Sequence, residues 1–227
     1  MREAGFTSTS IEIETPVEES LQSCHKIQNE NRDLLENVKQ RKKAGLQVSG
    51  GFIVGFDSDT STIFQRQIDF IQKSGIVSAM VGLLNAPKNT RLYEQMEEEN
   101  RLTVDATGSN TDFTMNFISK MDKQKLLEGY HRIINSIYKE RPYYKRLKEL
   151  FRKYKPVKAI LILHGSRHFL NPFLYWGFLN KSRFVYWKFM IWTIVNKPKR
   201  LEDAITFAVY GYHFRTVYGL RQVRHKY

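Results

Sequence analysis

The sequence predicts an α/β fold that continues into a basic, mostly helical region. Short apolar runs alternate with amphipathic segments through the first hundred residues, which is typical of right-handed βαβ units and a parallel sheet. The charge then changes sign: residues 1–100 hold 11 Lys and Arg against 15 Asp and Glu, whereas residues 101–227 hold 25 against 8. We therefore expect two regions with different surfaces.

Three segments are expected to form the strands of the sheet. Residues 6–13 are rich in β-branched side chains, and Pro16 ends this run. Residues 46–54 lead from an apolar run into a turn at Gly55, and residues 76–84 form the third apolar run. Runs of this length and composition are typical of strands.

Helices are expected between these strands. One helix would begin near Asn31 and end at Gly45, and the next would be capped by Thr60 or Ser61 and end at Gly75. Apolar residues recur at helical spacing in both segments, and glycine is a favoured residue just after a helix. The predicted order is therefore strand, helix, strand, helix, strand.

The chain is expected to divide after the third strand and one short acidic helix. We assign residues 1–100 to a sheet-containing domain, residues 101–121 to a connecting loop and residues 122–227 to a basic helical domain. Asp122 is placed to cap the first long helix of that domain, and Pro142 fits the first turn of the next one. Later helices are expected near residues 182–195 and 201–220.

A polar or glycine-rich segment follows each predicted strand. Glu14 ends the first strand, residues 50–60 span the end of the second, and residues 85–93 follow the third. In a parallel sheet or barrel, residues at the carboxyl ends of the strands point into the ligand site. Each segment also has a simpler interpretation, namely a solvated glutamate, a helix cap and an ordinary turn.

Taken together, these three segments resemble the second half of a radical S-adenosylmethionine (radical SAM) barrel. The resemblance rests on residues 50–57 (Gly-Gly-Phe-Ile-Val-Gly-Phe-Asp) and 81–87 (Val-Gly-Leu-Leu-Asn-Ala-Pro). It covers the chain from Glu12 to about Pro142 and is strongest to the cobalamin-binding enzymes that carry an additional helical C-terminal domain. It implies a partial TIM-like (β/α) barrel, followed by that helical domain.

The resemblance also implies part of a binding site for S-adenosylmethionine. Glu14 would bind the ribose, and Lys26 would reach the methionine carboxylate. The wall beside the adenine would be shaped by Gly51, Ile53 and Gly55. No catalytic residue is assigned within this chain.

The chain does not carry the residues with which the family holds its iron–sulfur cluster. Its one cysteine is Cys24, whereas three thiolates hold the four-iron cluster. Glu12 also replaces the glycine of the family's Gly-Ile-Glu segment. We expect no metal site here, so the cluster and cobalamin would belong to a missing N-terminal portion. The chain alone should then be inactive, within a parent that performs radical chemistry such as methyl transfer.

The expected partners and location follow from these assignments. The chain would contact the missing cluster- and cobalamin-binding portion, and the substrate would be a small molecule or a lipid. No apolar signal segment occurs near Met1, no apolar stretch reaches about 18 residues, and one cysteine allows no intramolecular disulfide. We expect a cytoplasmic protein with peripheral contact to the membrane.

A different class of function stays open for the basic region. Residues 169–195 are rich in aromatic side chains and carry Lys181, Arg183 and Lys188. They would either pack as helices against the sheet or present a patch to an anionic membrane surface or partner. Nucleic-acid binding is disfavoured, because the sequence contains no recognition-helix signature. The alternative function is therefore that of a non-catalytic basic module.

An incomplete barrel also predicts an exposed sheet. Three strands cannot close a barrel, so one strand edge and one face should stay uncovered. Because residues 48–54 and 76–84 are nearly continuous apolar runs, we expect the uncovered face to be apolar.

Overall fold

The structure is a computed structural model of the whole chain. It describes residues 4–23, 29–30, 32–103, 114–153 and 183–220. Cys24 and Lys26 lie outside the described residues. No helix in the described ranges is both long enough and apolar enough to cross a membrane.

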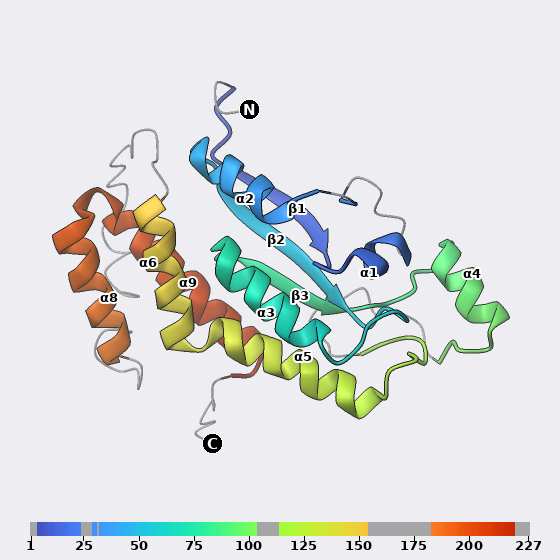
Figure 1. Cartoon of the computed structure of the whole chain (residues 1–227). Helices are drawn as coiled ribbons and strands as arrows, with labels where there is room; N and C mark the ends of the chain where they lie inside the picture. The colour runs from blue at the N-terminus through green and yellow to red at the C-terminus, as the bar shows by residue number, and fades with distance from the viewer. Residues whose placement is uncertain (1–3, 24–28, 31, 104–113, 154–182, 221–227) are drawn as a thin grey trace, which may run out of the picture.

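The sheet consists of three parallel strands, β1 (Ser8–Glu14), β2 (Gln47–Val54) and β3 (Ala79–Leu83), in the order β1-β2-β3 (Figure 1). The three predicted strands and their parallel pairing are confirmed. β3 begins later than expected, because the chain first meets the ladder at Ser78, whose carbonyl accepts a hydrogen bond from Gly50 N at 3.0 Å.

Four helices accompany these strands. α1 (Glu18–Ser23) follows β1, and α2 (Leu34–Lys43) leads into β2. α3 (Ile63–Ser74) connects β2 to β3, and α4 (Arg91–Glu98) follows β3 at the far end of the molecule from the C-terminal helices (Figure 1).

The ends of α2 show which local signals set its length. Asp33 caps the helix, with its carboxylate accepting a hydrogen bond from the first turn at 2.9 Å, so the prediction of Asn31 as the cap is wrong. The prediction for the other end is confirmed. Gly45 has a left-handed φ of 81°, and Leu46 N donates to Arg41 O, which satisfies a carbonyl of the last turn.

The residue at the cap position of α3 is Thr62, two residues after Thr60 and one after Ser61, so neither predicted cap is the observed one. Thr62 precedes its first residue and makes no hydrogen bond to the helix with its side chain. The Thr60 hydroxyl lies 2.8 Å from the Thr62 hydroxyl, so it is engaged with its neighbour instead of the first turn. Gly75 ends the helix at a φ of 67°, as predicted.

From Lys123 onward, the described chain is mostly helical. It forms α5 (Lys123–Tyr138), α6 (Glu140–Lys153), α8 (Arg183–Asn196) and α9 (Leu201–Val217), and a short 3-10 turn (Pro198–Arg200) joins the last two. Asp122 is confirmed as the cap of α5, because its carboxylate accepts a hydrogen bond from Lys125 N at 2.9 Å.

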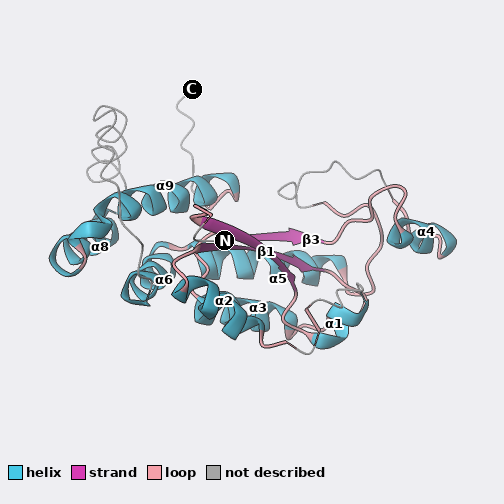
Figure 2. Ribbon diagram, turned by 90° about the horizontal axis from the view of Figure 1, so that it is seen from above, coloured by secondary structure: helices cyan, strands magenta, loops and turns pink. Residues whose placement is uncertain are grey.

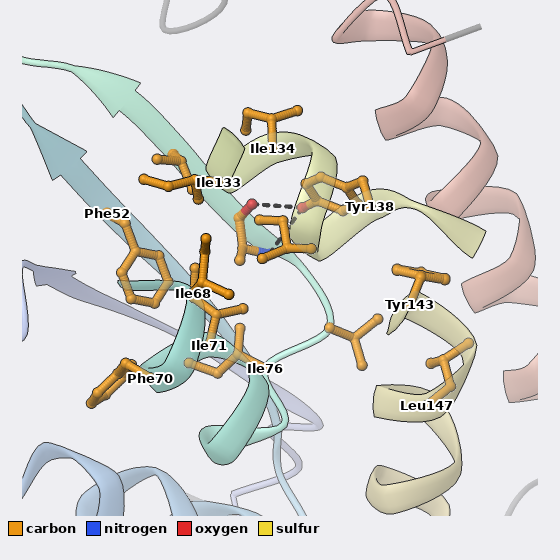
Figure 3. Close-up of a cluster of buried hydrophobic side chains, with 14 of the residues drawn as sticks. Phe52, Ile68, Phe70, Ile71, Ile76, Ile133, Ile134, Tyr138, Tyr143 and Leu147 are labelled. Atoms are coloured by element: carbon orange, nitrogen blue, oxygen red, sulfur yellow. Dashed lines mark hydrogen bonds between the residues drawn. The ribbon is translucent and has the colours of Figure 1, made fainter. Parts of the chain in front are cut away.

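One hydrophobic core joins the sheet to the helices. Phe52 of β2 packs edge-on against Phe70 of α3, with ring centroids 5.9 Å apart. α5 lies along α3, and Gly129 leaves room there for the Phe64 ring, which an added Cβ would overlap. Figure 3 shows part of this core, which includes Phe52, Ile68, Phe70, Ile71, Ile76, Ile133, Ile134, Tyr138, Tyr143 and Leu147.

Two tyrosines of α5 bind the main chain of β3. The Tyr138 hydroxyl donates to Ala79 O at 2.6 Å and accepts from Ala79 N at 3.2 Å (Figure 3). The Tyr130 hydroxyl donates to Val81 O at 3.0 Å. Both side chains are buried, so these bonds satisfy main-chain groups that water does not reach.

The helices lie on both sides of the sheet. Figure 2 shows α2, α3 and α5 on one side and α9 on the other. Phe214 of α9 stacks on Tyr138 with ring centroids 4.7 Å apart, which links this helix to α5. The fold is therefore mixed α/β with a three-stranded parallel sheet and a majority of helix. The domain boundary within residues 101–121 stays a prediction.

Candidate functional site

The face of the sheet opposite α2 and α3 carries small and polar side chains. Strand register places Ser10 beside Ser49, Glu12 beside Gly51, and Gly51 beside Met80. Successive side chains of a strand point to opposite faces, so the buried apolar residues that alternate with these positions point to the helices. This face is therefore mixed, because Ile53 and Met80 lie among the serines, the glycines and Glu12, and the prediction of an apolar uncovered face is confirmed only in part. We call this side the open face.

Glu12 lies across the middle of the open face. Its carboxylate occupies the space above Gly51, where an added Cβ would overlap it. Its carbonyl accepts a hydrogen bond from Asn29 Nδ2 at 2.9 Å, which fixes the main chain at this point. The glycine at position 51 thus leaves room for a neighbouring side chain over the main chain.

The carboxyl end of β1 is irregular. The pairing with β2 shifts between Glu12 and Glu14, and Glu14 has a φ of 63°, a conformation that non-glycine residues rarely adopt. Gln67 of α3 is fully buried and donates to Ile53 O at 2.7 Å and to Glu14 O at 3.4 Å. This side chain therefore ties the ends of β1 and β2 together.

The glycine turn after β2 is organised by one aspartate. The Asp59 carboxylate accepts hydrogen bonds from Gly55 N at 2.8 Å, Phe56 N at 3.1 Å and Ser20 Oγ at 2.9 Å. Burial raises the pKa of Asp59, although these donors oppose the increase. Its role here is structural, and it caps the turn and not α3.

An ion-pair cluster closes the turn on its outer side. Arg101 donates two hydrogen bonds of 2.6 Å to the carboxylate of Asp57 and one of 2.7 Å to Glu99. Its Nε donates to Ile118 O, and its guanidinium lies 5.7 Å from the centre of the Phe117 ring. These hydrogen bonds from Arg101 hold the pKa of Asp57 below its ordinary value.

The segment after β3 is held by a buried asparagine. Asn116 accepts from Ala86 N at 2.9 Å and donates to Ala86 O at 2.7 Å. Its main-chain N–H donates to Asn85 Oδ1 at 3.0 Å. Residues far apart in sequence therefore meet at the carboxyl end of β3.

Two hollows adjoin these strands. The first has a volume of about 230 Å³ and is the open face itself, with Ser10, Glu12, Ser49, Ser78 and Phe214 in its wall. Pockets for small molecules usually enclose about 300–1,000 Å³, so this hollow has the size of a partial site.

The second hollow lies beyond the carboxyl end of β3 and has a volume of about 590 Å³. Its wall is mostly apolar and includes Leu83, Met115, Phe117 and Leu126. Lys120 is among its polar lining residues. A hollow of this size and lining suits an apolar molecule with a few polar groups.

The structure brings together some of the predicted site residues. Gly51 and Ile53 both line the smaller hollow. Glu14 lies at the end of β1 and Gly55 in the turn after β2, and neither is in the wall of that hollow. Lys26 lies outside the described residues. The role of all five in cofactor binding stays a prediction.

Sequence reasoning missed three residues that shape this region. Glu12 precedes Ile13, an apolar residue that is buried in the core, so strand periodicity could have placed Glu12 on the opposite, open face. Gln67 is a polar residue within an apolar helical stripe, which gives only a weak signal. The contact between Asn116 and Ala86 joins loops distant in sequence, and no local pattern indicates it.

The open face fits one part of the expected cofactor set better than the others. Serine hydroxyls and a glutamate carboxylate can exchange hydrogen bonds with ribose hydroxyls, and Gly51 leaves the main chain accessible beside them. Among the described residues, no group of three His, Cys, Asp or Glu side chains is placed to hold a metal ion. The single cysteine cannot supply three thiolates, so the chain does not fit a four-iron cluster.

Comparison with known proteins assigns most of the C-terminal region. A family model described as "Domain of unknown function (DUF4070)" matches residues 90–226, which is more than half of the chain. No solved structure matches the chain.

Three curated relatives are named as methylating enzymes. An uncharacterized methyltransferase of Synechocystis sp. is 29% identical over 220 residues, which cover 94% of this chain and 41% of the relative. The hopanoid C-2 methylase of Rhodopseudomonas palustris is 35% identical over 116 residues, or 51% of this chain and 22% of that protein. The bacteriochlorophyllide d C-12(1)-methyltransferase of Chlorobaculum tepidum is 28% identical over 144 residues, which cover 63% of this chain and 31% of that protein. The chain spans less than half the length of each.

Proposed function

The chain belongs to the family described as a domain of unknown function, DUF4070, and from this we propose that it forms the C-terminal part of a radical SAM methyltransferase. In this role, the open face supplies part of the S-adenosylmethionine site. The helices that follow pack against the sheet and contribute to the part of the active site that binds the substrate. The cluster and cobalamin are held by another portion of the parent.

The observation that carries the proposal is the match to the Synechocystis methyltransferase. It covers 94% of this chain but only 41% of the relative, so that methyltransferase contains a further portion for which this chain has no counterpart. The two other relatives are named for methyl transfer to a hopanoid and to a bacteriochlorophyllide. All three names support methyl transfer as the reaction of the parent.

The geometry of the sheet supports a shared cofactor site. The hollow on the open face is too small to enclose a cofactor, and its wall is formed by the three strands and by Phe214 of α9. Additional strands from the missing portion would complete the wall. We assign to Glu12 and Glu14 the acceptance of hydrogen bonds from ribose hydroxyls, because Glu12 lines the hollow and Glu14 follows it at the carboxyl end of β1.

S-adenosylmethionine bound to a reduced cluster supplies the radical chemistry of such a parent. The residues of this chain bind and orient the cofactor. We assign the larger hollow to the substrate, because its wall is mostly apolar and it lies at the carboxyl end of β3. The substrate would then be an apolar molecule.

The test uses the complete parent protein, reconstituted anaerobically and reduced in the presence of S-adenosylmethionine. We expect S-adenosylhomocysteine and deoxyadenosine as products. Glu14→Gln should weaken cofactor binding by about ten- to a hundredfold, because a charged hydrogen-bond acceptor is lost. Equilibrium dialysis measures the affinity, and the exposed Glu97→Gln on α4 is the matched control.

Two results would contradict the proposal. One is the absence of both products from a parent that carries a complete cluster. The other is a full four-iron cluster with deoxyadenosine formation in the isolated chain, because one cysteine cannot hold such a cluster. If Glu14→Gln and Glu97→Gln bind the cofactor equally well, Glu14 is removed from the site while the rest of the proposal stands.

A further inference from the structure

Helix α8 has apolar residues on both of its sides. One side is buried against the rest of the molecule by Tyr186, Phe189, Met190 and Thr193. The other side is exposed, although its residues are large and apolar. Phe184 is 74% exposed, Ile191 58%, Ile194 49% and Val195 73%. We call these four residues the α8 face.

The α8 face is unusual within this chain. The nine large hydrophobic residues of the described ranges that are clearly exposed include these four, and the other five are distributed over four separate segments. A contiguous apolar surface of this kind commonly marks a binding site for a protein or a membrane. The predicted packing of this helix against its neighbours therefore explains its buried side but not its exposed apolar side.

Basic side chains gather beside the α8 face. Lys148 and Arg152 of α6 lie 5.2 Å and 5.8 Å from the centre of the Trp192 ring on α8. Lys188 is exposed on α8 itself. The pKa of Lys148 is lowered, first by burial and then by the positive charges of Lys188 and Arg152. These three residues form the basic cluster. Glu149 pairs with Arg152, and the positive charge of Lys148 and Lys188 beside this pair attracts an anion.

The composition of α8 extends this charge pattern. The helix holds no acidic residue over Arg183–Asn196. Basic residues flank the α8 face at both ends, with Arg183 before it and Lys197 and Lys199 after it. An apolar face bordered by cations is the pattern of helices that lie in the plane of an anionic bilayer surface.

We propose that the α8 face and the basic cluster dock the protein on the surface of an anionic lipid bilayer. Phe184, Ile191 and Val195 enter the region between the headgroups and the acyl chains. The basic cluster binds lipid phosphates. The helix lies parallel to the surface, because 14 residues extend about 21 Å and cannot cross the hydrocarbon layer.

The position of α8 allows docking without covering the candidate site. Figure 1 shows α8 at one end of the molecule, beyond α6, with the carboxyl ends of the strands and α4 toward the other end. Contact with a bilayer through α8 would therefore leave the open face accessible. This inference does not depend on the proposed methyl transfer.

The test is co-flotation of the full chain with lipid vesicles. We expect binding to vesicles of phosphatidylcholine mixed with phosphatidylglycerol, and weak binding to phosphatidylcholine alone. Added salt should reduce it. Lys188→Glu should lower the partition coefficient about tenfold, because it replaces a cation near the anionic surface with an anion. Ile191→Ser should lower it about five- to tenfold through the loss of buried apolar area.

Matched control variants separate the patch from the charge of the whole chain. Lys125→Glu changes the net charge equally but lies on the first turn of α5, and Ile118→Ser removes a side chain that is 59% exposed away from α8. Both should bind vesicles like the unchanged chain. All four positions are exposed, so each variant should fold. Thermal unfolding checks this.

A second measurement reports the contact directly. Trp187 and Trp192 lie on α8, so vesicles whose acyl chains carry bromine should quench tryptophan fluorescence. Equal loss of binding in Lys188→Glu and Lys125→Glu would overturn the proposal, as would binding to neither vesicle. Concentration-dependent self-association that Ile191→Ser abolishes, without vesicle binding, would also overturn it and assign the face to a second copy.

Discussion

The two faces of the sheet differ in what their residues do. On the covered face, Val48, Phe52 and Val54 of β2 are buried on the side of α2 and α3. On the open face, Ser49 and Gly51 of the same strand are only partly buried. One strand therefore contributes to the core on one side and to the candidate site on the other. Substitutions on the two faces should separate stability from binding.

The largest effect is expected on the covered face. Phe52→Ala should lower the free energy of unfolding by about 3–5 kcal/mol, because it leaves a cavity against Phe70 that the packed helices cannot fill. Urea unfolding measures this loss. Phe6→Ala is the control, since that ring is 54% exposed, and a similar loss in both variants would contradict the distinction between the faces.

A smaller effect is expected at the junction of the sheet with α5. Tyr138→Phe leaves the N–H and the carbonyl of Ala79 buried without their hydroxyl partner, so it should cost about 1–3 kcal/mol. The measurement is again urea unfolding. Tyr210→Phe serves as the control because Tyr210 is exposed, and equal stability of the two variants would show that the hydroxyl bonds contribute little.

The turn beyond the open face should give a pH-dependent effect. Arg101 lowers the pKa of Asp57 below its ordinary 3.8 in the folded chain. The ion pair therefore stabilises the fold above pH 3.8, and this contribution is lost as the pH falls through the lowered value. Asp57→Asn should cost about 1 kcal/mol near neutral pH, because the pair is partly exposed to solvent.

Unfolding by urea at neutral and at acidic pH measures this difference. The gap between Asp57→Asn and the unchanged chain should close once the carboxylate is protonated. Lys73→Gln, an exposed residue of α3, should show the same small difference at both pH values. A gap that widens at acidic pH would mean that Arg101 does not stabilise the charged form of Asp57.

The smallest effect on stability is expected on the open face. Glu12→Gln should change the free energy of unfolding by less than about 0.5 kcal/mol, because its side chain is exposed. In the parent enzyme, the same variant should weaken S-adenosylmethionine binding if Glu12 accepts ribose hydroxyls. Unfolding and equilibrium dialysis together check this, and a large loss of stability would place Glu12 with the structural residues.

Local patterns in the sequence predicted the elements whose signals are local. The runs that became β1, β2 and β3 were recognisable from composition, and Gly45 and Gly75 marked the ends of α2 and α3. Cap positions were less certain, because several polar residues near a helix start can serve. Only the neighbouring contacts select Asp33 in place of Asn31.

The chemistry of the open face could not be predicted from runs of apolar residues. Residues 48–54 look continuous in sequence, yet the alternation of side chains separates Ser49 and Gly51 from Phe52. Deciding which side faces solvent requires knowing where α3 and α5 lie. The pairing of Asn116 with Ala86 depends on loop geometry in the same way.

The tyrosines of α5 restrict the edge of the sheet at which a further strand can pair. The Ser78 carbonyl and Leu84 N–H bind β2, so Ala79 and Val81 direct their main-chain groups to the outer edge of β3. The hydroxyls of Tyr138 and Tyr130 form hydrogen bonds with those groups. A further strand would have to displace two buried side chains there, whereas along β1 the described contact is with Asn29. Any strand recruited to this sheet should therefore add beside β1, and β3 marks the side at which extension stops.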